Sequence, residues 1–326
     1  MVRGSLGRAI DLDATELREA YGFYAIPVQT FLALDAWVPH QTLLAEGKLV
    51  EVKAGDSDAE VIFCSHQWTS FDHPDPANEQ LKALQSVLTN LMAGKTDVVS
   101  NGMLDAVYQY RMITTGAEWK RKLPSMYLWI DYISIPQPGA LMSEASAELV
   151  SELDKDQSGV VDMNELVDAD LTKAKARSAS TTDHRLLQAN ADEQIAALVE
   201  QLKAAVDSIP SYIERSSMMW VVVPPVKHQS IDDAICDFAS WRRRGWCRME
   251  FAACKLACGD DMPLMVIKSE KEPPEYFNPC DMFKLCASRG EFTVDDDKAK
   301  VNKTLVTMLE AKAKWYAIAC TEPESP

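Results

Sequence analysis

Residues 126–137 of the chain read MYLWIDYISIPQ, a run of aromatic, β-branched and aliphatic side chains that holds one carboxylate, Asp131, and closes at Pro136. A strand with one solvated face would alternate polar and apolar residues, and this stretch does not. It therefore predicts a strand that is buried on both faces. Such strands belong to sheets covered by helices, and these sheets place their site residues where the strands end. We expect an α/β fold with a site at the far end of this strand.

Other apolar segments supply partners for this strand. Further strands are predicted at about residues 60–65, 218–223 and 263–267, and helices at about 81–91, 195–206, 244–255 and 298–320. The helix at 195–206 is expected to stop before Pro210, because proline lacks a backbone donor. Helical character is also expected between 103 and 122, with a short helix at 13–21 and an apolar stretch at 23–38. The order strand, helix, strand implies a parallel pair with a crossover.

Composition and charge narrow the classes of function. A net charge of −16 over 326 residues argues against nucleic acid and anionic membrane as general partners. No apolar run reaches the roughly 18 residues that span a bilayer, and residues 1–12 lack the continuous apolar core of a secretory signal. Eight scattered cysteines suit a reducing compartment better than a disulfide framework. These observations predict a cytoplasmic protein.

Half of the net negative charge lies in one short segment. Residues 144–171 hold nine acidic residues and one lysine, and within them residues 154–165 have the twelve-residue spacing of an EF-hand calcium loop. Gly159 stands at the sixth position, where the chain must turn sharply. The oxygen ligands expected for Ca²⁺ are Asp154, Asp156, Ser158, the Val160 carbonyl, Asp162 and Glu165. A bidentate Glu165 favours Ca²⁺ over the smaller Mg²⁺.

Two questions about this loop stay open in the sequence. The first question is whether the segment is an EF-hand at all, because an acidic helix–turn–helix could match the spacing by chance. The second concerns pairing, because EF-hands usually occur in pairs and the chain carries no second loop. Residues 295–297 are three aspartates, but they lack the glycine and the terminal glutamate. Self-association of two copies through their loops is one explanation.

Three stretches in order resemble the motifs of a known superfamily. They are VIFCSHQW at 61–68, LWIDYISIPQ at 128–137 and RGWCRME at 244–250. Together they resemble the TIR and heterokaryon-incompatibility (HET) superfamily. The middle motif is closest to HET domains, and the last is similar to the Trp-Cys-x-x-Glu motif of plant TIR domains. The resemblance implies a flavodoxin-like parallel sheet flanked by helices and a role in immune, stress or cell-death signalling.

The resemblance also implies an activity. Some members of the superfamily cleave NAD at the nicotinamide–ribose bond with the glutamate of the Trp-Cys motif, and Glu250 is the matching residue. A desolvated carboxylate can stabilise the positive charge that develops on the ribose. The residues expected around the nucleotide are Ser65, His66, Trp68, Asp131 and Trp246.

Each of these residues also suits an ordinary structural role. Trp246 and Cys247 suit a packed core, and His66 suits a cap on its strand through a backbone hydrogen bond. Glu250 suits the start of a helix, where the helix dipole favours an acid. A non-catalytic interaction module that responds to Ca²⁺ is therefore the alternative to an NAD-cleaving enzyme.

The expected organisation has three parts. Residues 1–59 form an N-terminal extension, residues 60–140 and 195–326 form a discontinuous TIR/HET-like α/β domain, and residues 141–194 form the EF-hand insertion and its linker. In this interpretation Ca²⁺ binding in the insertion regulates the α/β domain.

Overall fold

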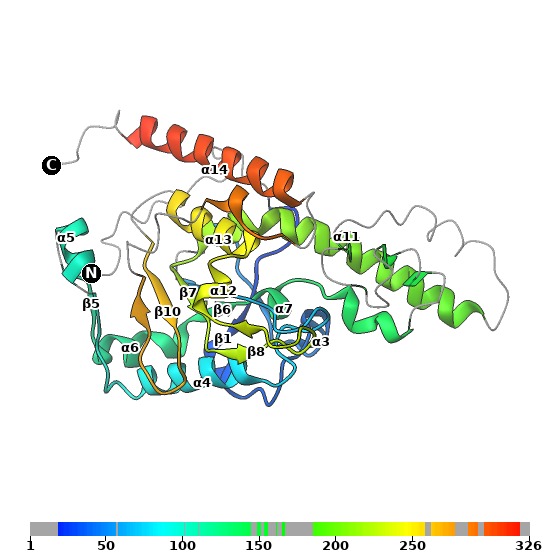
Figure 1. The fold of residues 1–326 in the computed structure, drawn as a ribbon, viewed down its shortest axis with the longest axis horizontal. Coiled ribbons are helices and arrows are strands. Elements are labelled where there is room, and N and C mark those ends of the chain that lie inside the picture. Colours follow the sequence, from blue (N-terminus) through cyan, green and yellow to red (C-terminus); the bar gives the residue numbers. More distant parts are fainter. Residues whose placement is uncertain are drawn as a thin grey trace.

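The structure is a computed structural model of the chain. It describes residues 19–56, 58–100, 102–109, 111–144, 149–150, 153–155, 161, 165–166, 185–257, 262–277, 286–292 and 297–319. A mixed seven-stranded sheet lies between two layers of helices, and one long helix extends well beyond the sheet (Figure 1). The α/β class expected from the sequence is confirmed.

The centre of the sheet is parallel and its edges are antiparallel. The strand order is β11-β10-β7-β3-β6-β1-β2. The four parallel strands are β10 (Leu264–Ile267), β7 (Met218–Val222), β3 (Val61–His66) and β6 (Tyr127–Trp129). The antiparallel edge strands are β11 (Glu275–Tyr276), β1 (Tyr24–Pro27) and β2 (Val50–Glu51). The parallel sheet expected from the sequence is thus present in the four central strands, whereas the edge strands are antiparallel. The segment expected as an N-terminal extension supplies two of these edge strands.

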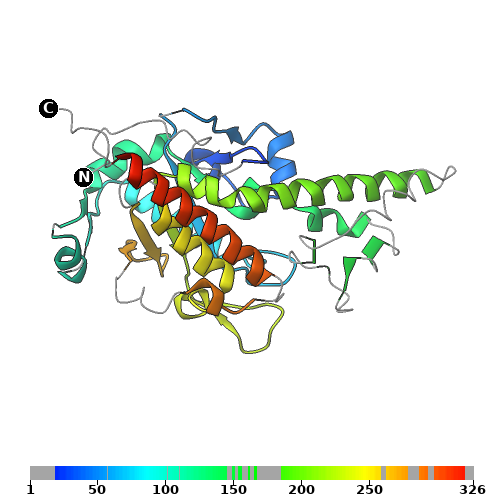
Figure 2. The same ribbon diagram turned by 90° about the horizontal axis from the view of Figure 1, so that it is seen from above.

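Helices cover both faces of the sheet. One face carries α11 (Arg185–Arg215), α13 (Gly245–Leu256) and α14 (Asp297–Ala319), with α14 lying over α13 (Figure 2). The other face carries α2 (Val28–Leu32), α3 (His40–Ala45), α4 (Glu79–Met92) and α6 (Gly116–Lys122). No helix in the described part of the chain is both long and apolar enough to cross a bilayer.

Shorter elements connect these layers. The short helices are α5 (Gly102–Tyr108), α7 (Asp131–Ser134), α12 (Phe238–Trp241), η1 (Leu123–Ser125), η2 (Pro138–Glu144) and η4 (Ala287–Arg289). Two small antiparallel sheets of two strands each pair β4 (Val98–Val99) with β5 (Ile113–Thr114) and β8 (Val226–Lys227) with β9 (Ile235–Cys236). The helical character expected between residues 103 and 122 is therefore interrupted by β5.

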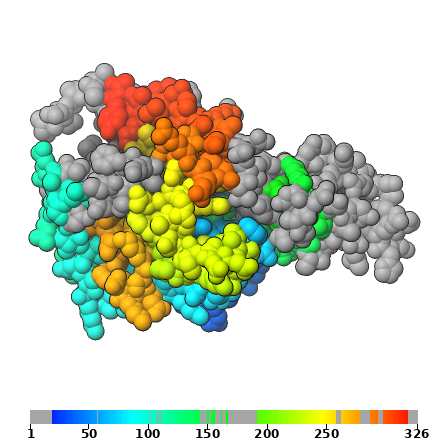
Figure 3. Space-filling view, in the orientation of Figure 1, coloured from blue at the N-terminus to red at the C-terminus, as the bar shows by residue number. Residues whose placement is uncertain are grey.

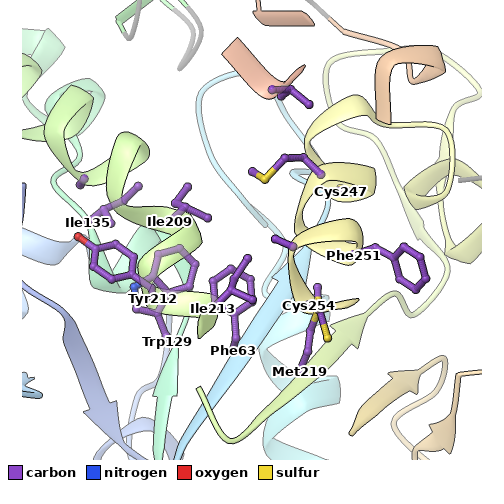
Figure 4. Packing of buried hydrophobic residues seen from close by; sticks show 14 of the residues in the cluster. Phe63, Trp129, Ile135, Ile209, Tyr212, Ile213, Met219, Cys247, Phe251 and Cys254 are labelled. Carbon is purple, nitrogen blue, oxygen red and sulfur yellow. The ribbon is translucent and has the colours of Figure 1, made fainter. Parts of the chain in front are cut away.

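The central strands fill a core on each face. Successive side chains of a strand point to opposite faces, so Phe63 of β3 enters the core under α11 while Ile62 enters the core under α4. Phe63 stacks on Trp129 of β6 with ring centroids 4.4 Å apart, and Tyr212 of α11 packs against Trp129 (Figure 4). Each fully buried side chain of this size contributes roughly 1.5–3 kcal/mol. The buried character expected of both strands is confirmed.

The strand expected at 126–137 is shorter than its apolar run. β6 ends at Trp129, and a helical turn, α7, begins at Asp131. The backbone N–H of Tyr132 donates to Asp131 Oδ1 at 2.6 Å, and the hydroxyl of Ser134 accepts from the N–H of Ile130 at 3.1 Å. These local hydrogen bonds turn the chain, and the sequence pattern reports burial without distinguishing the buried turn from a strand.

The expected stop before Pro210 is also wrong, because α11 continues through Pro210 to Arg215. Tertiary contacts hold the turn that follows the proline. The hydroxyl of Tyr212 donates to the Tyr21 carbonyl at 2.8 Å, and the Tyr212 ring stacks on Phe23 with centroids 5.1 Å apart. Packing therefore outweighs the backbone hydrogen bond that proline removes.

The insertion is joined to the core of the main domain. Leu149, Leu153, Val161 and Leu166 are all buried, and they belong to the same apolar cluster as Ile195 of α11. The element η2, which leads into the insertion, packs on α11. The described part of the insertion is thus not a separate body. The short helix expected at 13–21 lies mostly outside the described residues.

Candidate functional site

Polar side chains gather at the carboxyl end of β3, where the order of strands in the sheet reverses direction. After β3 the chain adds β6 on one side, and after β6 it returns to add β7 on the other side. Open α/β sheets bind ligands at the carboxyl ends of strands at such a switch point. Ser65 and His66 are the last two residues of β3, and each belongs to a separate group of hydrogen-bonded side chains.

The first group joins Ser65 to Glu250. The hydroxyl of Ser65 donates to Glu250 Oε2 at 2.5 Å and accepts from the indole N–H of Trp241 at 2.9 Å. Ser65 is 1% exposed and Trp241 is fully buried, whereas Glu250 is half-buried. Glu250 is the sixth residue of α13. Its carboxyl group is therefore bound to the sheet by the hydrogen bond from Ser65 of β3.

Glu250 has a strongly altered acidity. Burial raises its pKa to about 8; the hydrogen bond from Ser65 lowers it, nearby Asp131 raises it and His66 lowers it. The carboxyl group therefore titrates near neutral pH. Carboxyls with this property are enriched at functional sites.

The second group is an ion pair between His66 and Asp131. His66 Nε2 lies 2.8 Å from Asp131 Oδ1, and His66 Nδ1 lies 2.8 Å from Gln80 Oε1. The side-chain nitrogen of Gln80 donates to the carbonyl of Gln67 at 2.9 Å, which turns the amide oxygen of Gln80 toward the imidazole. Both ring nitrogens face acceptors, so both carry protons and His66 is an imidazolium.

The acidities of this pair agree with its geometry. Burial alone would lower the pKa of His66, but the charge and hydrogen bond of Asp131 raise it to about 9. Burial alone would raise the pKa of Asp131, but His66, the indole N–H of Trp68 and the N–H of Tyr132 hold it below its ordinary value. At neutral pH the carboxyl of Asp131 is ionised while that of Glu250 is largely protonated. The alternative role for His66 was to cap its strand through a backbone hydrogen bond. Its two ring nitrogens instead contact side-chain oxygens, those of Gln80 and Asp131.

Aromatic residues from the N-terminal segment and from α7 enclose the ion pair. Trp37 stacks on the imidazole of His66 with centroids 5.6 Å apart, and its indole N–H donates to Asp75 Oδ2 at 3.0 Å. Tyr132 packs edge-on to both Trp37 and Trp68. Asp131 keeps 28% of its side chain exposed beside these rings. Trp37, Gln80 and Trp241 are parts of the site that the sequence motifs did not indicate.

Four of the five residues expected around a nucleotide belong to these two groups: Ser65, His66, Trp68 and Asp131. The fifth, Trp246, is in neither group: its indole N–H donates to Asp297 Oδ2 at 2.9 Å, at the start of α14. Cys247 is buried, and its thiol donates to the His66 carbonyl at 3.8 Å. These two residues fill the structural role that the sequence left open for them, and Trp246 fastens α14 to α13.

The predicted calcium loop falls largely outside the described residues. Asp156, Ser158, Val160 and Asp162 lie there, whereas Asp154 and Glu165, the first and last expected ligands, are described. Glu165 is 7% exposed, and its Oε1 accepts from the backbone N–H of Lys155 at 2.8 Å. The two ends of the loop are therefore in contact. Among the described residues alone, no cluster of three metal-ligating side chains occurs.

Comparison of the chain with models of protein families, with curated proteins and with solved structures found no match. The case for a function is carried by the geometry of the site.

Proposed function

We propose that the chain is a calcium-binding signalling protein of the TIR/HET type, in which Glu250 cleaves NAD at the nicotinamide–ribose bond. The observation that carries this proposal is the contact of Glu250 with Ser65 at the switch point of the sheet, at 2.5 Å. The spatial order of the parallel strands, β6-β3-β7-β10, is second-first-third-fourth along the chain. This is the order of a flavodoxin-like sheet, which supports the resemblance in the sequence.

The proposed chemistry needs one ionised carboxylate beside the ribose. When the bond between ribose C1′ and the nicotinamide nitrogen breaks, both electrons leave with the nitrogen and positive charge moves to the ribose. The carboxylate of Glu250 stabilises that charge, and water then adds to C1′ with loss of a proton. The hydrogen bond from Ser65 orients the carboxylate and favours its ionised form.

Nicotinamide release from NAD tests the proposal. Purified protein is incubated with NAD with and without Ca²⁺, and the products are separated by chromatography. We expect release that Glu250→Gln abolishes and that Glu272→Gln, a change at an exposed position, leaves intact. Absence of release from the unaltered protein in both conditions, or equal release from Glu250→Gln, rules the activity out.

Calcium is assigned to the insertion on the chemistry of its donors. The buried carboxylate of Glu165 lies at the junction of the two loop ends, and a divalent cation would offset the cost of burying it. Titration calorimetry tests the assignment. Glu165→Gln should weaken Ca²⁺ binding at least about tenfold, and unchanged binding would refute the site.

A short connection supports regulation of the α/β domain by calcium. Asp131 is the first residue of α7, and η2, which leads to the loop, begins at Pro138. The side-chain nitrogen of Gln137 donates to the carbonyls of Asp131 and Ile135, at 3.3 and 3.0 Å. A change in the insertion therefore reaches Asp131 through a few hydrogen-bonded residues.

The second candidate is a non-catalytic module that responds to Ca²⁺. It is favoured by the hydrogen bonds of Asp131, whose two oxygens accept from His66, Trp68 and the backbone of Tyr132. Such a satisfied group can serve the fold alone. The NAD experiment separates the two candidates, because the module binds Ca²⁺ and releases no nicotinamide.

A further inference from the structure

Asp75, in the loop between β3 and α4, is a buried carboxylate that accepts four hydrogen bonds. The residue is 1% exposed, and its Oδ2 accepts from the indole N–H of Trp37 at 3.0 Å and from the backbone N–H of Gln80 at 2.7 Å. The backbone N–H groups of Glu79 and Leu81 also donate to it, each at 3.0 Å. The first N–H groups of a helix lack partners within the helix. Asp75 therefore caps α4 and ties Trp37 to its first turn.

Two of these donors belong to residues that contact His66. The ring of Trp37 lies nearly parallel to the imidazole, at an interplanar angle of 14° with centroids 5.6 Å apart. Oε1 of Gln80 lies 2.8 Å from His66 Nδ1. The face of an indole and the oxygen of an amide both carry negative partial charge, so both stabilise a protonated imidazole. Asp75 thus holds two of the groups that favour the imidazolium.

The orientation of the Gln80 side chain determines the charge of His66. Its nitrogen donates to the Gln67 carbonyl at 2.9 Å, which leaves its oxygen for the imidazole. If the amide were reversed, an N–H would face Nδ1, which would then accept and carry no proton. Burial raises the pKa of Asp131 and the charge of His66 lowers it, so a neutral imidazole would favour the protonated carboxyl. The backbone hydrogen bond to Asp75 fixes the position from which the Gln80 side chain extends.

The loop that carries Asp75 is itself fixed. The backbone N–H of Asp75 donates to His73 Nδ1 at 3.1 Å, and the N–H of Thr69 donates to the Pro74 carbonyl at 2.8 Å. The Thr69 carbonyl accepts from the N–H of Gln229 at 2.7 Å, which joins the loop to the segment between β8 and β9. That segment lies on the surface of the molecule (Figure 3). The carboxylate of Asp75 is therefore held in place below the surface.

We propose that Asp75 is a positioning residue of the candidate site. By holding Trp37 and Gln80 against the imidazole, it keeps His66 in its protonated form. Asp131 then stays ionised, with 28% of its side chain exposed. The effect of Asp75 on the imidazole is independent of any reaction, whereas its effect on NAD cleavage rests on the proposed function.

Nitrogen NMR of the imidazole in the full chain tests the positioning. Asp75→Ala removes the acceptor for Trp37 and Gln80, so the pKa of His66 should fall from about 9 by at least about 1. Asp75→Asn should keep this pKa at about 9, because an amide oxygen in the place of Oδ2 still accepts three of the four donors. An unchanged pKa in Asp75→Ala overturns the proposal.

A purely structural role for Asp75 would act through the start of α4. Thr115→Ala is the matched control, because the Thr115 side chain caps α6 and accepts from the N–H of Glu118 at 3.3 Å. The control should lower the stability of the fold and leave the pKa of His66 unchanged. An equal fall of this pKa in Thr115→Ala and Asp75→Ala would show that loss of a helix cap is sufficient, and would overturn the positioning.

Asp75→Glu takes the place of Asp75→Ala if the alanine variant does not fold. It retains the charge at the start of α4 but moves the carboxylate by one methylene, so its donors are displaced and the pKa of His66 should fall. A pKa that falls in Asp75→Asn and stays at about 9 in Asp75→Glu would assign the effect to charge, and would overturn the proposal.

The pH profile of nicotinamide release extends the test to the proposed function. Burial raises the pKa of Glu250 and His66 lowers it, so Asp75→Ala should move the midpoint of the profile to higher pH, and Asp75→Asn should not. A midpoint that stays in place while the pKa of His66 falls refutes a role of Asp75 in the reaction. A chain that releases no nicotinamide refutes the proposed function alone, and the NMR titration then decides the positioning.

Discussion

Ser65 links the sheet to the acidity of Glu250. Its hydroxyl donates to Glu250 Oε2, and this donation lowers a pKa that burial has raised to about 8. The proposed chemistry uses the ionised carboxylate. Nicotinamide release, measured as kcat/KM, should therefore increase as the pH rises toward 8 and level off above it.

Replacing Ser65 tests this link. Ser65→Ala removes the donor, so the pKa of Glu250 rises further and the midpoint of the pH profile moves to higher pH. The change also leaves the buried indole N–H of Trp241 without its acceptor, which costs about 1–3 kcal/mol of stability. Ser240→Ala is the control, because the Ser240 hydroxyl donates to Gln67 Oε1 and to the Asp237 carbonyl, and its loss should alter stability without moving the midpoint. An unmoved midpoint in Ser65→Ala contradicts the link.

Asp131 sets the charge of His66. The folded pKa of His66, about 9, exceeds the ordinary 6.5, so while Asp131 is ionised the pair contributes fully below pH 6.5 and loses this contribution as the pH rises through 9. Because His66 lowers the pKa of Asp131, the contribution is also lost in acid, as the pH falls through that lowered pKa. In Asp131→Asn the burial of the imidazole dominates, and its pKa should fall below 6.5. Histidine titration by NMR measures this change. Asp72→Asn should leave His66 as it is, because Asp72 acts on His73 and Tyr132.

At the scale of elements, the start of α13 depends on two glycines in contact. A Cβ on Gly290 would come within 2.8 Å of the nitrogen of Gly245 and closer still to its Cα, and these backbone atoms cannot move aside cheaply. The chain bonds across this contact, with the N–H of Gly245 donating to the Glu291 carbonyl at 2.8 Å. The close approach fixes the first turn of the helix that carries Glu250.

Gly290→Ala should therefore push α13 away from η4. We expect a loss of about 1–3 kcal/mol in the free energy of unfolding, typical of overpacking, together with a reduced rate of nicotinamide release. Chemical denaturation and the NAD assay measure the two effects. Gly102→Ala is the matched control, because an added Cβ meets no atom within 4 Å there. Equal stability of the two variants argues against the contact as a determinant.

The sequence predicts elements well where the pattern is local. The strands at 61–66, 218–222 and 264–267 and the helices α4, α13 and α14 follow from apolar spacing alone. The sequence pattern does not predict an element correctly where contacts between distant residues determine its conformation. The local hydrogen bonds of the turn at Asp131 are reinforced by donors from His66 and Trp68, more than 60 residues away. Helix α11 continues past Pro210 with the contacts of Tyr212 to the N-terminal segment.

The site shows the same division. Ser65, His66, Trp68 and Asp131 stand at the ends of predicted strands, and their convergence follows from strand order. Trp37 and Gln80 could not be found in this way, because their positions depend on how the loop and the first turn of α4 fold over His66. The motif containing Trp246 indicates a nucleotide contact as readily as a core residue, and only the bond to Asp297 assigns it to packing.

For the whole molecule, the shared core predicts that calcium stabilises the entire chain. Because Leu149, Leu153 and Leu166 pack in the main core, the insertion and the sheet should unfold together. Ca²⁺ at 100 times its dissociation constant adds about 2.7 kcal/mol, which corresponds to a rise of roughly 5 °C in Tm. Calorimetry should show one transition that moves with Ca²⁺.

At the same Ca²⁺ concentration the shift should fall to about half or less in Glu165→Gln, because binding about tenfold weaker leaves about 1.4 kcal/mol. It should be unchanged in Glu193→Gln, a change on the exposed side of α11. Two separate transitions, of which only the smaller responds to Ca²⁺, would show that the insertion folds by itself.

The pairing of β3 with β7 has a consequence for synthesis. Residues 61–66 lie at the centre of the sheet, and one of their two neighbouring strands begins only at Met218. At about 5–20 residues per second, a ribosome takes several seconds to a few tens of seconds to make the chain between them. During that time one edge of β3 has no strand to pair with. We therefore expect chaperones that shield open strand edges to increase the yield of folded protein.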